Sequence, residues 1–416
     1  MTDVFLALLR YTSRNEKSYQ RQVNMREQNS NEHQLPVLDE QTVRVLMRQV
    51  LGRQDIELLK FQVHRASDWT GPATRGVYHL TGIGREKERE VEWSLVLKVL
   101  SQTPEGRALG SSSQEHVLYW KREALVYQSD LLDDLPAGVR GPRCYSIMEQ
   151  ADSSVWLWLE EVKELCGPRW PLEQYARAAR GLGQMNGAYL AGRPLPDYPW
   201  LVRTGSPRGL LEHAGWMWKM AYDPSTWLHP RLHATFPLPI ASRLLHLWED
   251  RSVLLDVLER LPQTFCHLDA WRRNLFAAPK ADGEHQLIAI DWAYPGLGTI
   301  GTDIGDLMAA SFSLFGVEPC DPRTLDAVIF EGYLEGLSVA GWRGESRVVR
   351  CAFAIFTALK YACFLHWLSQ IIDESLSASW ERRTGHPLDQ CLENQARLIY
   401  YLLDLADEAR HLINSV

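Results

Sequence analysis

The segment TFCHLDAWRRNLFAAPKADGEHQLIAID, residues 264–291, constrains this chain more than any other stretch. Its apolar runs NLFAA and HQLIAI are separated by Asp282-Gly283, a dipeptide typical of a β-hairpin turn. A hairpin brings its two open ends together, so Asn274 and Asp291 should be neighbours, with Asp269 on the loop just before them. We therefore expect three oxygen-bearing side chains to converge.

This combination of side chains suits one kind of chemistry. Hard divalent cations prefer oxygen ligands from carboxylates and amides. Phosphoryl transfer needs such a cation to neutralise charge on the phosphates, and a separate carboxylate to receive the proton of the attacking hydroxyl. The structural alternative is a capped loop followed by a hairpin with an Asp at a strand end. His267, Asp269 and Asn274 form an HxDxxxxN pattern, and the hairpin that follows it ends at Asp291. This spacing along the sequence favours the functional interpretation.

A second signal is Lys98, which stands in the middle of an expected strand at 90–100. Both faces of that strand are apolar apart from this lysine, so its ammonium should be partly buried and need a partner. The expected helix at 116–132 supplies Glu123 on a face that also holds aromatic residues. We predict a Lys98–Glu123 ion pair, of the kind that holds the α- and β-phosphates of a nucleotide. The alternative is a solvent-facing glutamate.

The remaining pattern gives the order of the elements. Residues 39–52 are predicted to form a helix that Asp39 caps and Gly52 ends. Strands are expected at 56–66, 76–84, 90–100, 143–150 and 154–162. The helix at 116–132 is expected to turn these residues toward the core: Val117, Trp120, Leu125 and Leu132. After residue 170, helices are expected at 172–192, 207–221, 238–261, 322–340, 346–371 and 387–413.

A glycine-containing segment, DWTGPATRGVYHL, lies between two of the expected strands. Small residues with free backbone N–H groups can wrap phosphate oxygens. The candidates of this kind are Thr70, Gly71, Thr74, Arg75 and Gly76. Many hairpin loops have a similar composition, so this segment alone is a loose match.

Taken together, these residues resemble the aminoglycoside phosphotransferase and choline kinase-like family, relatives of the protein kinases. The resemblance begins near residue 39 and follows the glycine-containing segment, Lys98, Glu123, the LEEV segment, HLDAWRRN and IDW. It implies an α+β, bilobal protein-kinase-like fold. A small antiparallel β-rich N-lobe would span 39–162, a large helical C-lobe 163–416, and a mobile N-terminal tail 1–38.

The resemblance also implies roles for individual residues, with ATP or GTP bound between the lobes. Asp269 would be the catalytic base, and His267 would brace its loop. Asn274 and Asp291 would bind Mg²⁺. The residues that it implies for the nucleotide are Lys98 with Glu123, the five residues of the glycine-containing segment, and the backbone of Leu159, Glu160, Glu161 and Val162. Asp303 would support the active site from behind.

The implied activity is that of a small-molecule kinase that phosphorylates a hydroxyl of a sugar, an amino-sugar or aminoglycoside, or an amino-alcohol. The alternative is a catalytically inactive kinase fold that binds a nucleotide or metabolite. Three departures from the family pattern leave the acceptor open: Leu268 where Gly is usual, Asn186 where His is frequent, and the Arg272–Arg273 pair. Candidate acceptor-binding residues are Trp216, Trp218, Trp227, Tyr333, Trp342, Trp367, Asp306, Glu331, Glu335, Asp373 and Glu374.

Other functions fit less well. There is no DFG triplet, and no APE segment follows Asp291 to anchor a peptide-binding activation loop. GLGTIG, residues 296–301, formally matches a dinucleotide fingerprint, but the alternating βα pattern and the tight strand-to-helix turn are missing. A protein-binding scaffold with a tryptophan-rich surface is a further alternative, since the chain has sixteen tryptophans. Trp93, Trp120, Trp156 and Trp158, however, lie in core-patterned elements, which favours packing in the core.

Composition and charge narrow the setting. A net charge of −8, with no basic run longer than a pair, argues against a nucleic-acid partner. The seven cysteines are odd in number and show no CxxC spacing, so we expect reduced thiols and a cytoplasmic location. The longest apolar run, 351–368, contains Lys360 and His366, which favours a buried helix over a membrane span. We expect a monomer or homodimer.

Overall fold

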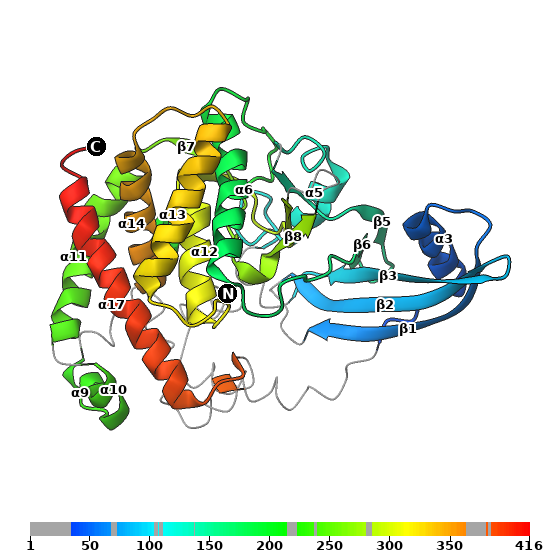
Figure 1. The fold of residues 1–416 in the computed structure, drawn as a ribbon, viewed down its shortest axis with the longest axis horizontal. Helices are drawn as coiled ribbons and strands as arrows, with labels where there is room; N and C mark the ends of the chain where they lie inside the picture. The colour runs from blue at the N-terminus through cyan, green and yellow to red at the C-terminus, as the bar shows by residue number, and fades with distance from the viewer. Residues whose placement is uncertain are drawn as a thin grey trace. The chain divides into compact units, whose positions relative to one another are not determined.

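The computed structural model describes residues 35–67, 73–103, 107, 111–136, 138–213, 223–236, 239–279, 285–362, 380–381 and 384–416 (Figure 1). The chain forms two compact units. The described residues of the first lie within 35–134 and 141–163, and those of the second within 135–140 and 164–416. The predicted α+β fold, with a small antiparallel β-rich unit and a large helical one, is confirmed. Residues 1–34 of the predicted tail lie outside the described residues.

The β-rich unit contains a five-stranded sheet in the order β1-β2-β3-β6-β5, and every neighbouring pair is antiparallel. Its strands are β1 (Glu57–Ser67), β2 (Thr74–Glu86), β3 (Arg89–Leu100), β5 (Cys144–Glu149) and β6 (Val155–Leu159). The five predicted strands are confirmed. Lys98 stands on the central strand β3, opposite Val77 on one side and Leu157 on the other.

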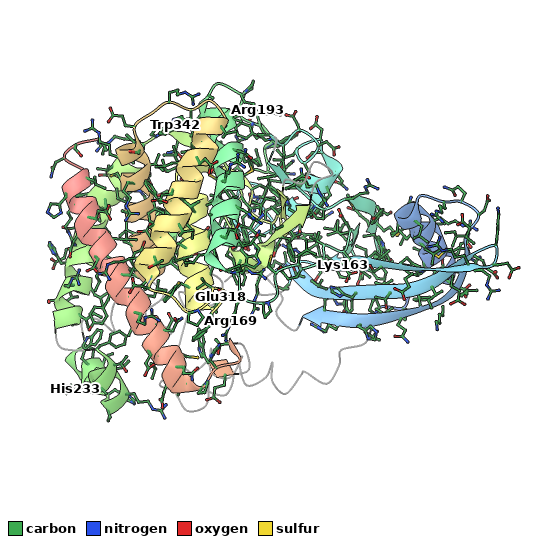
Figure 2. The ribbon with its side chains drawn as sticks, viewed as in Figure 1. Lys163, Arg169, Arg193, His233, Glu318 and Trp342 are labelled. Carbon is green, nitrogen blue, oxygen red and sulfur yellow. The ribbon has the colours of Figure 1, made fainter. Side chains whose placement is uncertain are left out.

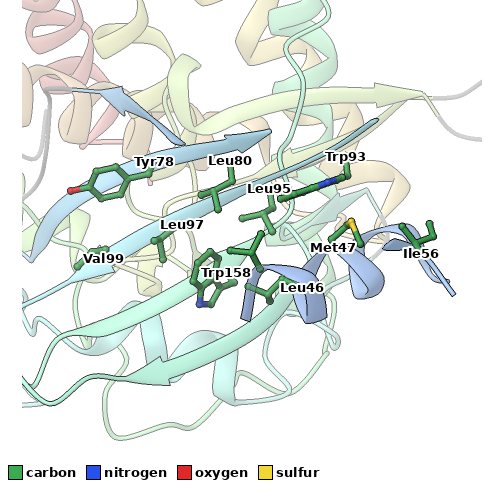
Figure 3. Packing of buried hydrophobic residues seen from close by; sticks show 11 residues of the cluster. Leu46, Met47, Ile56, Tyr78, Leu80, Trp93, Leu95, Leu97, Val99 and Trp158 are labelled. Atoms are coloured by element: carbon green, nitrogen blue, oxygen red, sulfur yellow. The ribbon is translucent and has the colours of Figure 1, made fainter. Parts of the chain in front are cut away.

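Helix α3 (Glu40–Leu51) packs on one face of this sheet. The Asp39 carboxylate accepts the backbone N–H of Thr42 at 2.8 Å, and Gly52 ends the helix at φ 65°. Both predicted caps are confirmed. The main residues of this core are Val43, Leu46 and Met47 from the helix, with Leu80, Trp93, Leu95, Leu97 and Trp158 from the sheet (Figure 3).

Helix α5 (Arg122–Gln128) contributes to the core on the other face, with Ala124 against Leu157 and its neighbours. The predicted helix at 116–132 is wrong in length. The buried Arg122 guanidinium donates to the carbonyl oxygens of His116 at 2.6 Å and Val117 at 2.7 Å. The residues before α5 form turns, in which the Tyr119 N–H also donates to the His116 carbonyl at 2.9 Å. The buried face is also shifted, to Arg122, Glu123, Ala124 and Val126, and Val117, Trp120, Leu125 and Leu132 are only partly buried.

The second unit is mainly helical. Its helices are α6 (Leu172–Leu190), α7 (Arg208–His213), α9 (Pro224–Trp227), α10 (Pro230–Thr235), α11 (Pro239–Leu258), α12 (Thr302–Ser313), α13 (Pro322–Val339), α14 (Ser346–Ala362) and α17 (Leu388–Leu412). Figure 1 shows α6, α12, α13 and α14 side by side. The predicted helices at 172–192, 238–261, 322–340 and 387–413 are confirmed. Those at 207–221 and 346–371 run into residues outside the described part, and α12 was not predicted.

The predicted hairpin is present in the helical unit. Strand β8 (Leu275–Pro279) pairs antiparallel with β9 (His285–Ala289), and its first residue lies opposite the last residue of β9. The turn dipeptide Asp282-Gly283 lies outside the described residues. Strand β4 (Val139–Arg140) adds a parallel partner to β9, and β7 (Gln263–Cys266) pairs antiparallel with β10 (Gly296–Thr299).

The GLGTIG segment does not form a dinucleotide loop. Its first two glycines lie inside β10, where they allow close packing of the backbone. A Cβ on Gly296 would stand 2.1 Å from the Val202 carbonyl oxygen, and one on Gly298 would stand 2.9 Å from Leu268 Cδ2. Gly301, at φ 88°, precedes the first residue of α12. All three glycines therefore serve packing and the start of a helix.

None of the helices in the described part of the chain combines the length and apolarity needed to cross a membrane. The six cysteines in the same part are free thiols: Cys144, Cys166, Cys266, Cys320, Cys351 and Cys391. Cys363 lies outside it.

Candidate active site

The loop that follows β7 carries Asp269, and the short 3₁₀ helix η2 (Arg272–Asn274) ends with Asn274. The Asn274 side-chain amide donates to the Asp269 backbone oxygen at 3.0 Å and to its carboxylate Oδ2 at 2.9 Å. Both side chains are buried. Across the hairpin, the Ile290 N–H donates to the Asn274 carbonyl at 2.8 Å, and Asp291 is the next residue. The structure thus brings Asp269 and Asn274 into contact and places Asp291 at the adjoining strand end.

Two backbone positions in this loop and strand end are strained. Leu268 has φ 61° and Asp291 has φ 60°. A residue with a Cβ in the left-handed region costs about 1–2 kcal/mol, and such residues cluster at functional sites. The sequence analysis did not foresee either one. Leu268 directly precedes Asp269, and Asp291 itself carries a proposed functional carboxylate.

Leu268 illustrates how the strained position is maintained. Its N–H donates to Asp303 Oδ1 at 2.9 Å, which fixes the backbone. Its side chain lies where a Cβ on Gly205 or Gly298 would come within 2.6 and 2.9 Å of Cδ2. The usual glycine at this position of the family pattern suits a positive φ. Here, two neighbouring glycines provide the room that the leucine needs.

Asp303, in the first turn of α12, holds the loop from behind. Its Oδ2 accepts the His267 N–H at 3.1 Å and the Asn186 amide at 3.3 Å, in addition to the Leu268 contact at Oδ1. Burial raises the pKa of Asp303 to about 6, although these hydrogen bonds act in the opposite direction. The carboxylate therefore fixes two consecutive residues immediately before Asp269.

His267 connects the loop with the hairpin. Its ring is fully buried, and Nε2 lies 3.0 Å from the Ile290 carbonyl oxygen. The ring also packs edge-on against Trp292, with 4.5 Å between centroids. These contacts connect His267, two residues before Asp269, to Ile290 and Trp292, the residues on either side of Asp291.

The Asp269 carboxyl has a pKa shifted toward neutrality. The pKa of Asp269 is raised to about 7, mainly by burial; the carboxylates of Asp291 and Asp306 act in the same direction, and the Lys360 ammonium acts against them. A general base works best when its pKa lies near the working pH, because it can then both accept and release a proton. Asp269 therefore has the burial and pKa that proton transfer requires.

In the β-rich unit, the predicted ion pair is confirmed. Lys98 Nζ lies 2.5 Å from Glu123 Oε2, and the two side chains are 9% and 3% exposed. A lysine at this depth needs such a partner, because an isolated buried charge is costly. The pair presents one ammonium group near the surface of the central strand.

The predicted phosphate loop is described only in part. Two of its residues lie outside the described part: Thr70 and Gly71. Thr74 begins β2, and Arg75 on the same strand forms an ion pair with Asp152 at 3.0 Å. A Cβ on Gly76 would stand 2.6 Å from the Tyr78 hydroxyl, so this glycine admits a ring. These three residues belong to a strand end, and a phosphate-binding role for them stays a prediction.

The segment predicted to meet the purine follows β6. The Glu160 N–H donates to the Arg143 carbonyl at 2.8 Å, and the Glu160 carboxylate accepts the Arg143 N–H at 2.9 Å. Glu161 lies 3.5 Å from His79. Val162 is partly buried beyond the strand. The Glu160 N–H is therefore already used, and a purine contact at this segment stays a prediction.

The side chains that could hold a metal form a mixed set. Over the ranges that the structure describes, no group of three or more His, Cys, Asp or Glu side chains is arranged to hold a metal ion. Asn274 and Asp291 offer one amide and one carboxylate. Mg²⁺ is commonly held by one or two carboxylates, with waters and phosphate oxygens completing its shell. The set therefore fits Mg²⁺ in the company of a phosphate ligand.

The candidate acceptor residues are scattered. Tyr333 is fully buried and hydrogen-bonded to Asn186 at 2.8 Å, and Glu335 forms an exposed ion pair with Arg180. Trp342 lies beyond the C-terminal end of α13 (Figure 2). Glu331 is exposed and Trp227 is partly buried. The remaining candidates apart from Asp306 lie outside the described residues: Trp216, Trp218, Trp367, Asp373 and Glu374.

Asp306 is the candidate that the structure places near Asp269, with two partners that the sequence analysis missed. Its Oδ1 accepts from Lys360 Nζ at 2.6 Å and from the Tyr361 hydroxyl at 2.7 Å. The available signal was a lysine inside the apolar run 351–368. It was interpreted only as evidence against a membrane span.

The loop that carries Asp269 is also held by Arg272, whose buried guanidinium forms an ion pair with Glu164 at 2.6 Å. It stacks on Trp170 at 4.3 Å from the ring centroid and donates to the Gly167 carbonyl. The Arg272 N–H donates to Ser311 on α12. The arginine pair that departs from the family pattern therefore begins with a residue that anchors η2.

No protein-family model matches the chain, and no curated protein does. Among solved structures, it is similar to a choline kinase from Cryptosporidium parvum, with 12% identity over 90% of this chain and 99% of that chain (TM-score 0.47). It is similar to an aminoglycoside phosphotransferase from Alicyclobacillus acidocaldarius, with 15% identity over 92% and 99% (TM-score 0.44). An amicoumacin kinase in complex with AMP-PNP and Ca²⁺ shares 16% identity over 86% and 94% (TM-score 0.45). The first two bear the names of the family that the sequence motifs resemble.

Proposed function

We propose that this chain is a small-molecule kinase that transfers the γ-phosphate of ATP or GTP to a hydroxyl of a sugar, an amino-sugar or an amino-alcohol. The observation that carries the proposal is the Asp269 site. A buried carboxylate with a pKa near 7 is held by Asn274 and lies beside a second carboxylate, Asp291, at a strained strand end. This is a base next to two oxygen ligands, the minimum that phosphoryl transfer requires.

The proton transfer follows from the loop geometry. Asn274 fixes the Asp269 carboxylate through Oδ2, and Asp303 fixes the backbone that leads to it. An acceptor hydroxyl within hydrogen-bond distance of Asp269 gives its proton to the carboxylate as its oxygen attacks the γ-phosphorus. The bond from that phosphorus to the bridging oxygen breaks, and the nucleoside diphosphate leaves.

The phosphates themselves need positive charge. A bound Mg²⁺ would neutralise charge on the phosphate oxygens, and Asn274 and Asp291 would hold it. Lys98 would neutralise the α- and β-phosphates, with Glu123 keeping the ammonium in one orientation. In support of these roles, Glu123 pairs with Lys98 in one unit, and Asn274 contacts Asp269 in the other.

The test is Asp269→Asn, which removes the base and keeps the shape of the side chain. We expect kcat to fall about 10²–10⁴-fold. The rise in thermal midpoint caused by ATP or GTP with Mg²⁺ should stay as in the wild type, because binding to the folded state is unchanged. Release of ADP or GDP across a panel of sugars, aminoglycosides and amino-alcohols gives the rate. The exposed Asp389→Asn provides the matched control.

Two results would count against the proposal. Wild-type turnover by Asp269→Asn would remove the base assignment. A wild-type chain that binds nucleotide and phosphorylates no hydroxyl compound would favour the alternative of a nucleotide-binding protein without turnover.

A further inference from the structure

The Asp306 cluster, made of Asp306 with Lys360 and Tyr361, joins α12 to α14 beside the proposed base. Asp306 is fully buried, and its Oδ1 accepts from both partners. Its Oδ2 is buried with no hydrogen-bond partner among the described residues. The Lys360 side chain, in contrast, keeps 15% of its surface exposed. The carboxylate is therefore enclosed, and the lysine that it holds still reaches accessible space.

Stability alone gives a poor account of this cluster. Two charges lose their hydration on burial, and replacing such a pair by apolar residues of similar size is often neutral or stabilising. The surroundings are suited to that replacement, because the neighbouring residues of α14 are largely buried and apolar. We therefore look for a function of the charged pair that an apolar pair could not perform.

The cluster lies within electrostatic range of Asp269. Lys360 lowers the pKa of the Asp269 carboxyl, Asp306 raises it, and Asp269 in turn contributes to the raised pKa of the buried Tyr361. The contacts of α12 place the cluster along the loop that carries Asp269. Asp303 accepts the N–H groups of His267 and Leu268 before Asp269, and Ser311 accepts the Arg272 N–H after it. Asp306 stands between these two anchoring residues on the same helix, and it holds the Lys360 ammonium.

We propose that Lys360 is a phosphoryl-binding residue, whose ammonium, oriented by Asp306 and Tyr361, contacts the oxygens of the phosphoryl group as it is transferred. The inference rests on the proposed function and adds to it a second cation for the γ-phosphoryl group. During transfer, the acceptor oxygen forms its bond to the γ-phosphorus and the bond to the bridging oxygen breaks. The hydroxyl proton goes to Asp269, and Lys360 keeps its own protons throughout.

Two groups could contact the Lys360 ammonium, the transferred phosphoryl group or a part of the acceptor, and their chemistry decides between them. The acceptor oxygen that contacts Asp269 is bonded to the phosphorus in the product, so the phosphoryl group must lie next to the base. It carries negative charge on three equatorial oxygens, for which a lysine is a compact counter-charge. An amine on the acceptor would be repelled by the ammonium, so Lys360 does not suit an amine subsite.

The experiment compares two nucleotides that differ in the γ-phosphate. Dissociation constants for AMP-PNP and ADP, each with Mg²⁺, are measured by calorimetry on the wild type and Lys360→Met. If GTP proves to be the donor, the guanine counterparts are used. We expect about 10- to 100-fold weaker AMP-PNP binding, the loss of one hydrogen bond to a charged group, and ADP binding within about twofold of wild type. Turnover should fall about 10²–10³-fold, the usual effect of removing one preorganised donor.

Two further variants keep the test decisive. Arg347→Met removes an exposed basic residue from the same helix and should change neither nucleotide's affinity. If Lys360→Met does not fold, the double variant Lys360→Met/Asp306→Leu leaves no unpaired buried charge and carries the same measurement. Its AMP-PNP affinity should fall as that of the single variant would.

The outcomes separate the inference from the function on which it rests. An unchanged ratio of AMP-PNP to ADP affinity would overturn the role of Lys360 and leave the kinase intact. A raised acceptor KM with unchanged nucleotide binding would overturn it too, by assigning the lysine to the acceptor. A wild-type protein that binds neither nucleotide would overturn the proposed function and this inference together.

Discussion

Each unit of this molecule contains a buried lysine–carboxylate pair, and the two pairs differ in how they can be recognised. Lys98–Glu123 and Lys360–Asp306 have similar N···O distances, 2.5 and 2.6 Å. Lys98 stands on a strand whose faces are both apolar, so its neighbours reveal that it must be buried. Lys360 stands on a helix, where a long side chain can run along apolar surface to water. The burial of a lysine can therefore be predicted from the sequence of a strand that is apolar on both faces. On a helix, the same sequence pattern is compatible with an exposed lysine.

The largest effect should come from removing the acidic partner of either pair. Asp306→Ala and Glu123→Ala should each cost up to about 3–5 kcal/mol, because each removes the carboxylate that pairs with a lysine largely shielded from water. Asp306→Ala should be the more severe, since Lys360 and Tyr361 both donate to the carboxylate that it removes. Thermal unfolding followed separately in the two units, by a probe in each, measures the difference. Equal midpoints for both variants and the wild type would mean that neither pair is buried in solution.

Replacing both partners should reverse that loss and separate stability from function. The free energy of unfolding should stay within about 1.5 kcal/mol of the wild type in both double variants, Lys98→Met/Glu123→Leu and Lys360→Met/Asp306→Leu. The reason is that a shape-matched apolar pair avoids the desolvation cost of the charges. Both should still be defective in phosphoryl transfer. Midpoints for the double variants together with turnover complete the comparison. A double variant as unstable as its single-alanine counterpart would show that the pair itself contributes stability.

The helical unit should also respond to pH in a way that its buried carboxyls define. The pKa of Asp269 is raised to about 7 and that of Asp303 to about 6, from an ordinary value of about 4. The folded state then binds more protons than the unfolded state between about pH 4 and 7, so stability falls as pH rises through that window. The thermal midpoint of the nucleotide-free, metal-free protein should therefore decrease over this range, and less so in Asp269→Asn. A midpoint rising with pH in the wild type, relative to Asp269→Asn, would contradict the shift.

Tyr361→Phe tests a single hydrogen bond of the Asp306 cluster. Removing one of the two donors to Asp306 Oδ1 while the lysine remains should cost about 1.5–3 kcal/mol, the range for a hydrogen bond to a charged group. Since burial keeps the pKa of Tyr361 well above its usual value, the hydroxyl remains a donor at every working pH. Midpoints at pH 6 and pH 8 should therefore show the same difference from wild type. A difference that changed between them would assign a titrating partner to the tyrosine.

Much of the frame was predictable because it depends on local periodicity. The five strands, both caps of α3 and the hairpin that joins Asn274 to Asp291 follow from patterns within a few residues. The Lys98–Glu123 pair followed from strand alternation together with one helix face. These features need no knowledge of distant contacts.

The errors and omissions have a common cause in side chains that reach beyond their own element. The buried Arg122 guanidinium binds the carbonyl oxygens of the turns before α5, a contact that the apolar periodicity of this segment does not indicate. The positive φ of Leu268 depends on Asp303 and on glycines far away in the sequence. Lys360 became a candidate only when α12 brought Asp306 against it. Helix α12 itself was not predicted, because within its residues the sequence analysis considered only single side chains, Asp303 and Asp306.

The leucine at position 268 has a consequence for how this chain can change over time. Its side chain fills the space that a Cβ on Gly205 or Gly298 would need, so the three positions are not independent. An alanine at either glycine would displace Leu268 Cδ2, the far end of a flexible side chain, so the leucine would have to adopt another arrangement. A substitution at one of these three positions therefore changes the packing that the other two require.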